Sequence, residues 1–303
     1  MKKIISIIAS ITLFTFLLAG CQKDTNKLKI VTTNSILYDM TKQVVGKQAQ
    51  VTNIVPIGQD PHEYEIKPQD IKAITDADII IYNGLNLETA SGWFQKALKQ
   101  ADKDLSSKEV VAASKGVKPI YLNMKHDKSS LDPHAWLSIQ NGIQYVKNIS
   151  AAVKKADKQH AKIYDNNTKL YTKNLDQLDK KYKNKFKDIE KSRRHLITSE
   201  GAFKYFARDY HINHGYIWEI NTDKQGTPEQ MKQAVDYVKK NKVKSLFVET
   251  SIDQRSMKSL SETTHVPITS KVYTDSIGKQ GTDGDSYFKM MEHNIKVIHD
   301  GLK

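Results

Sequence analysis

Residues 141–188 join the two halves of this chain and read NGIQYVKNISAAVKKADKQHAKIYDNNTKLYTKNLDQLDKKYKNKFKD. No glycine or proline occurs between residues 143 and 200. Apolar residues recur at helical spacing, namely Val146, Ile149 and Val153, and then Leu175, Leu178, Tyr182 and Phe186. This pattern predicts one long helix over 141–188, weakest at 166–168. At about 1.5 Å per residue it would be about 68 Å long, too long for one small lobe, so we expect a rigid rod joining two lobes.

On both sides of this segment, strand-like runs alternate with helix-like runs. The expected strands are 28–33, 51–55, 79–82, 110–112, 195–198, 216–220, 245–248 and 268–272. The expected helices are 36–45, 67–74, 92–101, 202–210, 228–240, 253–263 and 288–302. Such alternation is typical of parallel sheets flanked by helices. We therefore expect an α/β fold with an N-terminal lobe at 28–140 and a C-terminal lobe at 189–303, each with a mainly parallel sheet flanked by helices, joined by the one long rigid helix.

Two helices of the second lobe carry local signals. Thr227, Pro228 and Gln230 form the start expected of a helix, with a capping residue followed by proline in the first turn. In the last expected helix, His293 and His299 lie outside the apolar stripe. We expect both histidines on the surface and not in a metal site.

The first residues indicate an exported, lipid-anchored protein. A basic start precedes an apolar run over 4–18, which is short for a membrane span and typical of a signal peptide at 1–20. The sequence Leu-Ala-Gly-Cys at 18–21 resembles a bacterial lipobox, which implies cleavage before Cys21 and acylation of its thiol. Residues 21–27 would then tether the protein to the outer side of the cell membrane. Cys21 is the only cysteine, which excludes an intramolecular disulfide and a thiolate zinc site.

The positive charge of the chain does not indicate a nucleic-acid partner. The formal net charge is +13 at pH 7, but only four of the 47 basic residues are arginine. Base readout and bidentate phosphate contacts favour arginine, and export separates the chain from nucleic acid. We interpret the charge as a solvated, lysine-rich surface that faces an anionic cell envelope.

The tripeptide Asp-Pro-His occurs twice, at residues 60–62 and 132–134. Proline fixes its own φ and restricts the residue before it, so each histidine is presented from a stiffened loop. A preorganised ligand loses less entropy when it binds. His62 and His134 are therefore candidate metal ligands.

Two histidines alone make a weak site, so the second lobe is expected to supply acidic ligands. Open α/β sheets bind ligands beyond the carboxyl ends of their strands. Glu200, Glu249 and Asp275 each lie just past an expected strand. Spacing alone does not rank these three residues.

Further segments run in order through the mature chain: IVTTNSILYDM, VPIGQDPHEYEIKPQD, DADIIIYNGLNLET, DPHAWLS, ITSEGAFKYFA, GTPEQM, VETS and YTDSIG. In these segments the chain resembles the metal-binding lipoproteins of bacterial manganese and zinc ABC importers, and most of all the manganese transport lipoproteins. The resemblance implies a metal between two lobes, held by His62, His134, Glu200 and Asp275, with Glu249 as a neighbour. It also implies a solute-binding protein, not an enzyme, that delivers Mn(II) to an ABC permease and its ATPase. We expect a monomer.

The donor set suits manganese, because two carboxylates and two imidazoles make a harder site than three imidazoles. Zinc-specific relatives often carry a long loop rich in histidine and acids before the second ligand, whereas residues 124–130 here are short and hold one histidine. Zinc binds most such sites more tightly, so it is expected as a competitor, and zinc delivery is an alternative. A zinc hydrolase with Glu200 or Glu249 as general base is disfavoured, because four protein ligands leave no position for water and the chain has no His-Glu-x-x-His run. An adhesin is a further alternative.

Overall fold

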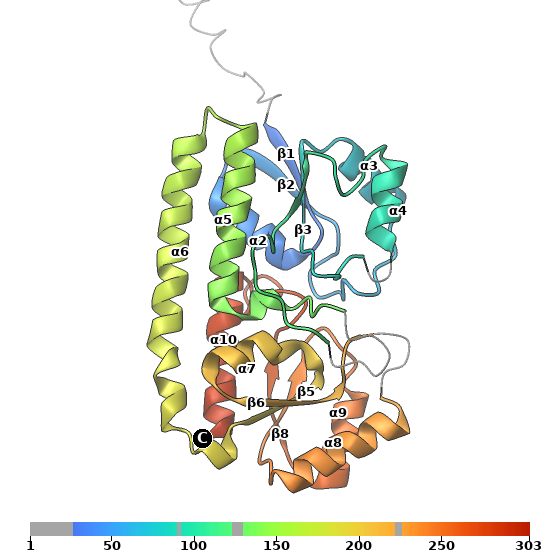
Figure 1. Ribbon diagram of the computed structural model, residues 1–303, viewed down its shortest axis with the longest axis vertical. Coiled ribbons are helices and arrows are strands. Elements are labelled where there is room, and N and C mark those ends of the chain that lie inside the picture. Colours follow the sequence, from blue (N-terminus) through green and yellow to red (C-terminus); the bar gives the residue numbers. More distant parts are fainter. Residues whose placement is uncertain (1–26, 90–91, 123–129, 222–225) are drawn as a thin grey trace, which may run out of the picture.

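The structure, a computed structural model, describes residues 27–89, 92–122, 130–221 and 226–303 (Figure 1). The expected signal peptide, Cys21 and the tether up to residue 26 lie outside these residues, as do residues 124–129. Within the described residues, no helix combines the length and the apolar character needed to cross a membrane.

The first lobe is built on a four-stranded parallel sheet. Its strands are β1 (Leu28–Thr32), β2 (Ala49–Asn53), β3 (Ile79–Tyr82) and β4 (Val110–Ala112), in the order β2-β1-β3-β4. Its helices are α2 (Ser35–Val45), α3 (Pro68–Thr75) and α4 (Trp93–Gln100). Helix α2 begins where the Asn34 side chain accepts hydrogen bonds from the backbone N–H groups of Ile36 and Leu37, and it ends before Gly46 at φ 56°.

The second lobe contains two parallel strand pairs. These are β5 (His195–Glu200) with β6 (Asn213–Trp218), and β7 (Leu246–Glu249) with β8 (Ile268–Val272). Its helices are α7 (Lys204–Tyr210), α8 (Pro228–Lys240), α9 (Arg255–Thr264) and α10 (Tyr287–Leu302). Helix α8 starts with the capping box expected from the sequence, formed by Thr227 and Gln230. The predicted α/β architecture with parallel sheets flanked by helices is therefore confirmed.

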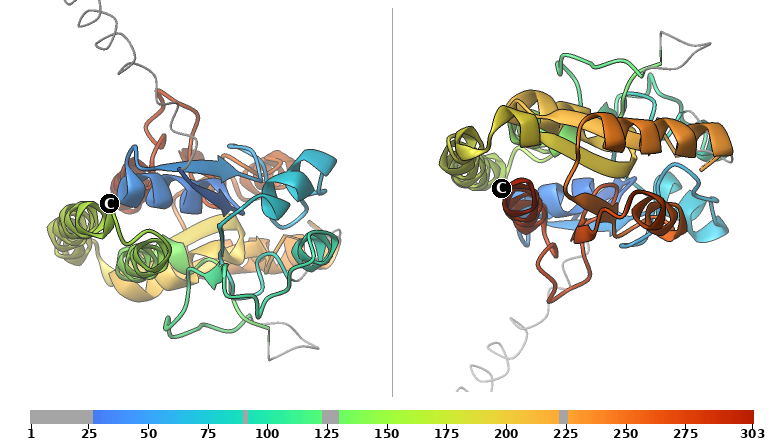
Figure 2. Two further views of the ribbon diagram at one scale, coloured as in Figure 1. Left: turned by 90° about the horizontal axis from the view of Figure 1, so that it is seen from above. Right: turned by 90° about the horizontal axis from the view of Figure 1, so that it is seen from below.

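The prediction of one long helix over 141–188 is wrong. The segment forms two helices, α5 (Ile139–Ala156) and α6 (Ala161–Lys183), which lie side by side as an antiparallel pair (Figure 1). Figure 2 shows the same pair end-on at one side of the molecule. Helix α6 alone runs past both lobes, and its 23 residues correspond to about 35 Å.

Asp157 explains why the helix breaks where it does. Its backbone leaves the helical region, at φ −127° and ψ 82°. Its side chain accepts hydrogen bonds from the backbone N–H of His160 at 3.2 Å and from the Tyr164 hydroxyl at 2.6 Å, which starts the second helix. The expected weak point at 166–168 lies inside α6, where Asn167 donates to the backbone carbonyl of Val44 at 3.0 Å. Asn167 therefore docks α6 onto α2 instead of ending the helix.

The largest apolar core crosses from one lobe to the other. It includes residues of β1, α6, α7 and α10 and of the turn before α5, among them Ile30, Trp136, Leu175, Phe206 and Met291. Smaller clusters fill the outer side of each lobe. Side chains of both lobes therefore share one close-packed interior, which joins the lobes away from their outer sides.

The expectation for His299 is also wrong. Its side chain is buried, with Nε2 3.0 Å from a carboxylate oxygen of Asp188 and its ring edge-on to Phe186. The polar side of α10 is covered by the turn that follows α6, which the stripe pattern of one helix does not reveal. His293 is partly exposed, and neither histidine belongs to the site described next.

Candidate metal centre

The two Asp-Pro-His tripeptides fold in the same way. In the first, a carboxylate oxygen of Asp60 accepts the backbone N–H of His62 at 2.7 Å. In the second, a carboxylate oxygen of Asp132 accepts the backbone N–H of His134 at 2.9 Å. The same Asp132 oxygen lies 2.8 Å from Nδ1 of His134, which directs Nε2 of that ring towards the second lobe.

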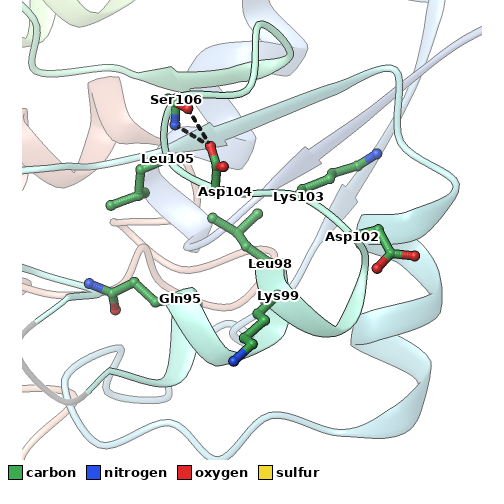
Figure 3. A pocket seen from close by; sticks show the side chains of 8 residues that line it. All are labelled: Gln95, Leu98, Lys99, Asp102, Lys103, Asp104, Leu105 and Ser106. Atoms are coloured by element: carbon green, nitrogen blue, oxygen red, sulfur yellow. Dashed lines mark hydrogen bonds between the residues drawn. The ribbon is translucent and has the colours of Figure 1, made fainter.

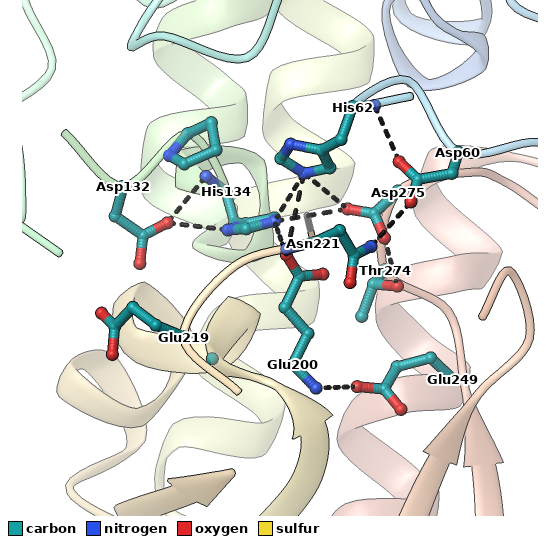
Figure 4. Close-up of polar contacts among 12 residues, drawn as sticks. Asp60, His62, Asp132, His134, Glu200, Glu219, Asn221, Glu249, Thr274 and Asp275 are labelled. Atoms are coloured by element: carbon teal, nitrogen blue, oxygen red, sulfur yellow. Dashed lines mark hydrogen bonds and ion pairs between the residues drawn. The ribbon is translucent and has the colours of Figure 1, made fainter. Parts of the chain in front are cut away.

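The acidic residues of the second lobe take different roles. Glu200 ends β5 and Asp275 follows β8, and both side chains point towards the histidines (Figure 4). Glu249 ends β7, and its carboxylate accepts the backbone N–H groups of Ser199 at 3.2 Å and Glu200 at 2.8 Å. Glu249 therefore holds the backbone that presents Glu200.

His62, His134, Glu200 and Asp275 form one cluster, called here the His/Glu/Asp cluster. One donor atom from each lies within 4.8 Å of the others. The two Nε2 atoms are 3.3 Å apart, and their distances to the nearest oxygens of Glu200 and Asp275 are 3.4–3.9 Å. Metal–ligand bonds of about 2.0–2.2 Å in a tetrahedron would separate the donor atoms by about 3.3–3.6 Å. The spacing therefore fits a single transition-metal ion.

Two buried oxygens in the cluster lack a hydrogen-bond partner among the described residues. They are Oε2 of Glu200 and Oδ1 of Asp275. The exposed fractions of these two residues are 0% and 1%. An unpartnered buried carboxylate oxygen is costly, and a bound cation would satisfy it.

The protonation of the two histidines differs. Burial lowers the pKa of His62 to about 4, so its ring is neutral near pH 7. Burial alone would also lower the pKa of His134, but the carboxylates of Glu200 and Asp132 raise it well above its usual value. Burial raises the pKa of Glu200 strongly, whereas His134 holds the pKa of Asp275 below its usual value despite burial. Protons and a metal ion therefore compete for Nε2 of His134.

Three supporting residues were missed by the sequence patterns or had no role assigned. Asp60 and Asp132 belong to the repeated tripeptide, so their repetition was the available signal. The backbone N–H of Asn221 donates to Glu200 Oε1 at 2.8 Å, but no local pattern marks this residue because it meets Glu200 only in the folded chain.

A separate hollow of about 630 Å³ lies on the first lobe, beside α4 and the turn after it (Figure 3). Its lining includes Lys99, Asp104 and Ser106, and Ser106 donates to Asp104 within that turn. No residue of the His/Glu/Asp cluster lines it.

A family model described as ZnuA, zinc-uptake complex component A, periplasmic, matches residues 30–301. The chain belongs to the ZnuA family. Its relatives include the manganese ABC transporter substrate-binding lipoprotein PsaA of Streptococcus pneumoniae, 46% identical over all of this chain and 99% of that protein.

Solved structures resemble this ZnuA-family chain throughout. The Mn-bound periplasmic metal binding protein of Candidatus Liberibacter asiaticus has a TM-score of 0.81 and 27% identity, over 92% of this chain and 100% of its own. The periplasmic zinc binding protein TroA of Treponema pallidum has a TM-score of 0.83 and 26% identity, over 91% of this chain and 99% of its own.

Proposed function

We propose that this protein captures Mn(II) as cargo in the His/Glu/Asp cluster and delivers it to an ABC permease driven by an ATPase. The observation that carries this proposal is a buried set of two imidazole nitrogens and two carboxylates, each with one unpartnered oxygen, drawn from both lobes. The carboxylates give the site a hard character that suits manganese. The PsaA relative is named as a manganese transporter lipoprotein, which supports the same cargo.

Zinc is the second candidate cargo, because the family description and the TroA structure both name it. Nitrogen and oxygen sites generally bind zinc more tightly than manganese, so affinity alone does not identify the ion carried in the cell. A role in transport fits the buried cluster better than catalysis, since a catalytic zinc keeps one position open for water.

The proposal includes a location and partners. The protein acts as a monomer on the outer side of the cell membrane, anchored by acylated Cys21 after removal of residues 1–20. Two acyl chains suffice for stable anchoring. The permease and its ATPase are the proposed partners for delivery.

Two measurements test the cargo. Titration calorimetry of the soluble chain from residue 22 should give one Mn(II) per molecule, and the variant His134→Ala should abolish that binding. Elemental analysis of protein purified from its own host should then find manganese in excess over zinc. Absence of stoichiometric Mn(II) binding contradicts the proposal, and zinc in the host protein favours the second candidate.

A further inference from the structure

The aspartate of each Asp-Pro-His tripeptide divides its two oxygens between the two lobes. In both, Oδ1 accepts the backbone N–H of the tripeptide's own histidine, as described above. Oδ2 of Asp60 accepts a hydrogen bond from the side-chain amide of Asn221 at 2.7 Å. Oδ2 of Asp132 lies 3.2 Å from the ammonium of Lys204. Two separate loops of the first lobe are thus each tied to the second lobe through an aspartate Oδ2.

Both donors also hold the segment that carries Glu200. Asn221 donates its backbone N–H to Glu200 Oε1 at 2.8 Å (Figure 4). Lys204 donates to the backbone carbonyl of Gly201, the residue after Glu200, at 2.7 Å. Each donor therefore connects one histidine-bearing loop of the first lobe with the same acidic residue of the second.

We propose that Asn221 and Lys204 are positioning residues that lock His62 and His134 onto Glu200, so that the complete metal site exists only while both ties between the lobes are made. This inference rests on the proposed function. Neither donor is one of the four residues of the His/Glu/Asp cluster. Residues that orient metal ligands typically change metal affinity roughly 10–100-fold when they are replaced.

The two ties differ in kind. Asn221 uses both ends of its side-chain amide, because its side-chain oxygen also accepts the indole N–H of Trp218 at 2.8 Å, and its exposed fraction is 4%. This arrangement fixes which end of the amide faces Asp60. The Lys204 ammonium lies between Asp132 and Glu219, 3.0 Å from the latter, with a side chain that is 16% exposed. Its contribution is therefore mainly electrostatic, and salt screens it only weakly because both pairs are largely buried.

The Asn221 tie can be reversed without losing a hydrogen bond. In the double variant Asp60→Asn with Asn221→Asp, the new amide at 60 donates across the lobes, and the new carboxylate at 221 accepts it together with the Trp218 indole. In Asp60→Asn alone, two amide N–H donors would face each other across the lobes. In Asn221→Asp alone, two carboxylate acceptors would face each other. We expect each single variant to release Mn(II) roughly 10-fold faster or more, and the double variant to return close to the wild-type rate.

Lys204→Met tests the second tie, with Lys103→Met as a matched control. Lys103 pairs with Glu109 at 3.4 Å and lines the hollow beside α4, which holds no residue of the cluster, and its side chain is 15% exposed, against 16% for Lys204. We expect Lys204→Met to release Mn(II) roughly 10-fold faster or more, with partial rescue in Lys204→Arg, and Lys103→Met to match the wild type.

The readouts are the Mn(II) release rate at saturating chelator, the visible spectrum of the Co(II)-loaded protein and the unfolding temperature of the metal-free protein. A changed Co(II) spectrum with an unchanged unfolding temperature supports a positioning role. If the double variant releases metal as fast as the singles, or if Lys204→Met keeps the wild-type rate and spectrum, the positioning role is wrong. A wild type that binds no Mn(II) contradicts the proposed function itself, so the two failures are distinguishable.

Discussion

Asp275 divides its two oxygens between a hydrogen bond to a neighbouring hydroxyl and the His/Glu/Asp cluster. Oδ2 accepts the Thr274 hydroxyl at 2.9 Å, while Oδ1 faces Nε2 of His134 at 3.4 Å and has no hydrogen-bond partner among the described residues. His134 keeps the pKa of Asp275 low, so this carboxylate is charged before any metal arrives. Asp275 thus presents an anionic oxygen to the centre of the cluster.

Replacement of Asp275 should therefore alter metal choice. In Asp275→Ala, manganese loses one of the few hard ligands that it requires, whereas three ligands and a water still satisfy tetrahedral zinc. We expect the Mn(II)-to-Zn(II) affinity ratio to fall about tenfold or more in competition titrations. The exposed acid Asp253, also in the second lobe, gives the control variant Asp253→Ala. An unchanged ratio in Asp275→Ala contradicts a role for Asp275 in selectivity.

Sequence patterns predicted part of this cluster. The repeated tripeptide marked His62 and His134, and the structure brings both rings together. Strand ends marked Glu200, Glu249 and Asp275 without ranking them, because each acid stands at the same kind of position. Only the folded chain shows that Glu249 turns to backbone N–H groups while the other two face the histidines. Their roles as metal ligands stay a prediction.

At the level of the elements, Glu88 joins the carboxyl ends of β1 and β3. Its carboxylate accepts the hydroxyl of Thr33 at 2.6 Å and the backbone N–H groups of Asn83 at 2.7 Å and Gly84 at 3.3 Å. Asn83 in turn donates to the carbonyl of Pro133, next to His134, at 3.0 Å. Burial raises the pKa of Glu88 to about 7, which makes this joint sensitive to pH.

The stability of the metal-free protein should therefore carry a Glu88 contribution that is lost as pH rises. The unfolded chain releases the Glu88 proton near its ordinary pKa of 4.5, and the folded chain holds it until about 7. The free energy of unfolding then falls as pH rises from 4.5 to about 7, and Glu88 accounts for at most about 3 kcal/mol of this fall. We expect Glu88→Gln to remove this part of the pH dependence of the unfolding free energy, measured by denaturant titrations at several pH values from 4.5 to 7.5. Exposed Glu262→Gln is the control, and parallel curves for wild type and Glu88→Gln contradict the assignment.

Most elements could be predicted from local patterns, and the exceptions have physical reasons. The strands at 79–82, 110–112 and 268–272 were placed correctly, since each is a short run bounded by polar residues or by turns. The strand expected at 216–220 lies at 213–218, because its pairing with β5 sets its limits. The break at Asp157 was missed because it depends on side-chain bonds to residues three and seven positions later.

On the scale of the whole molecule, α6 and the shared core join the lobes. The boundaries at residues 140 and 189 stay a prediction, and the structure does not divide the core at either. Helix α10, from the end of the chain, packs into the same interior as β1 from its beginning. The two lobes are therefore expected to unfold together.

The proposed lipid anchor at Cys21 also belongs to the scale of the whole chain. Cys21→Ser removes the thiol that the lipobox resemblance identifies as the acylation site. We expect the variant to lose incorporation of labelled fatty acid and to appear unprocessed or in the culture medium, as shown by immunoblots of cells and medium. Ser10→Ala, in the same leader, is the control that should remain labelled. Equal labelling of Cys21→Ser and wild type rejects the anchor.

The burial of the cluster has a consequence for cells whose surroundings change. The exposed fractions of His62, His134, Glu200 and Asp275 are 6%, 0%, 0% and 1%. On the proposed function, a competing scavenger outside the cell would reach the bound ion only when the protein opens, so its own abundance would not speed the release. Protein molecules that bound their ion before the supply of metal fell would keep it until they open. The population on the cell surface would then act as a short-term reserve that reflects earlier supply.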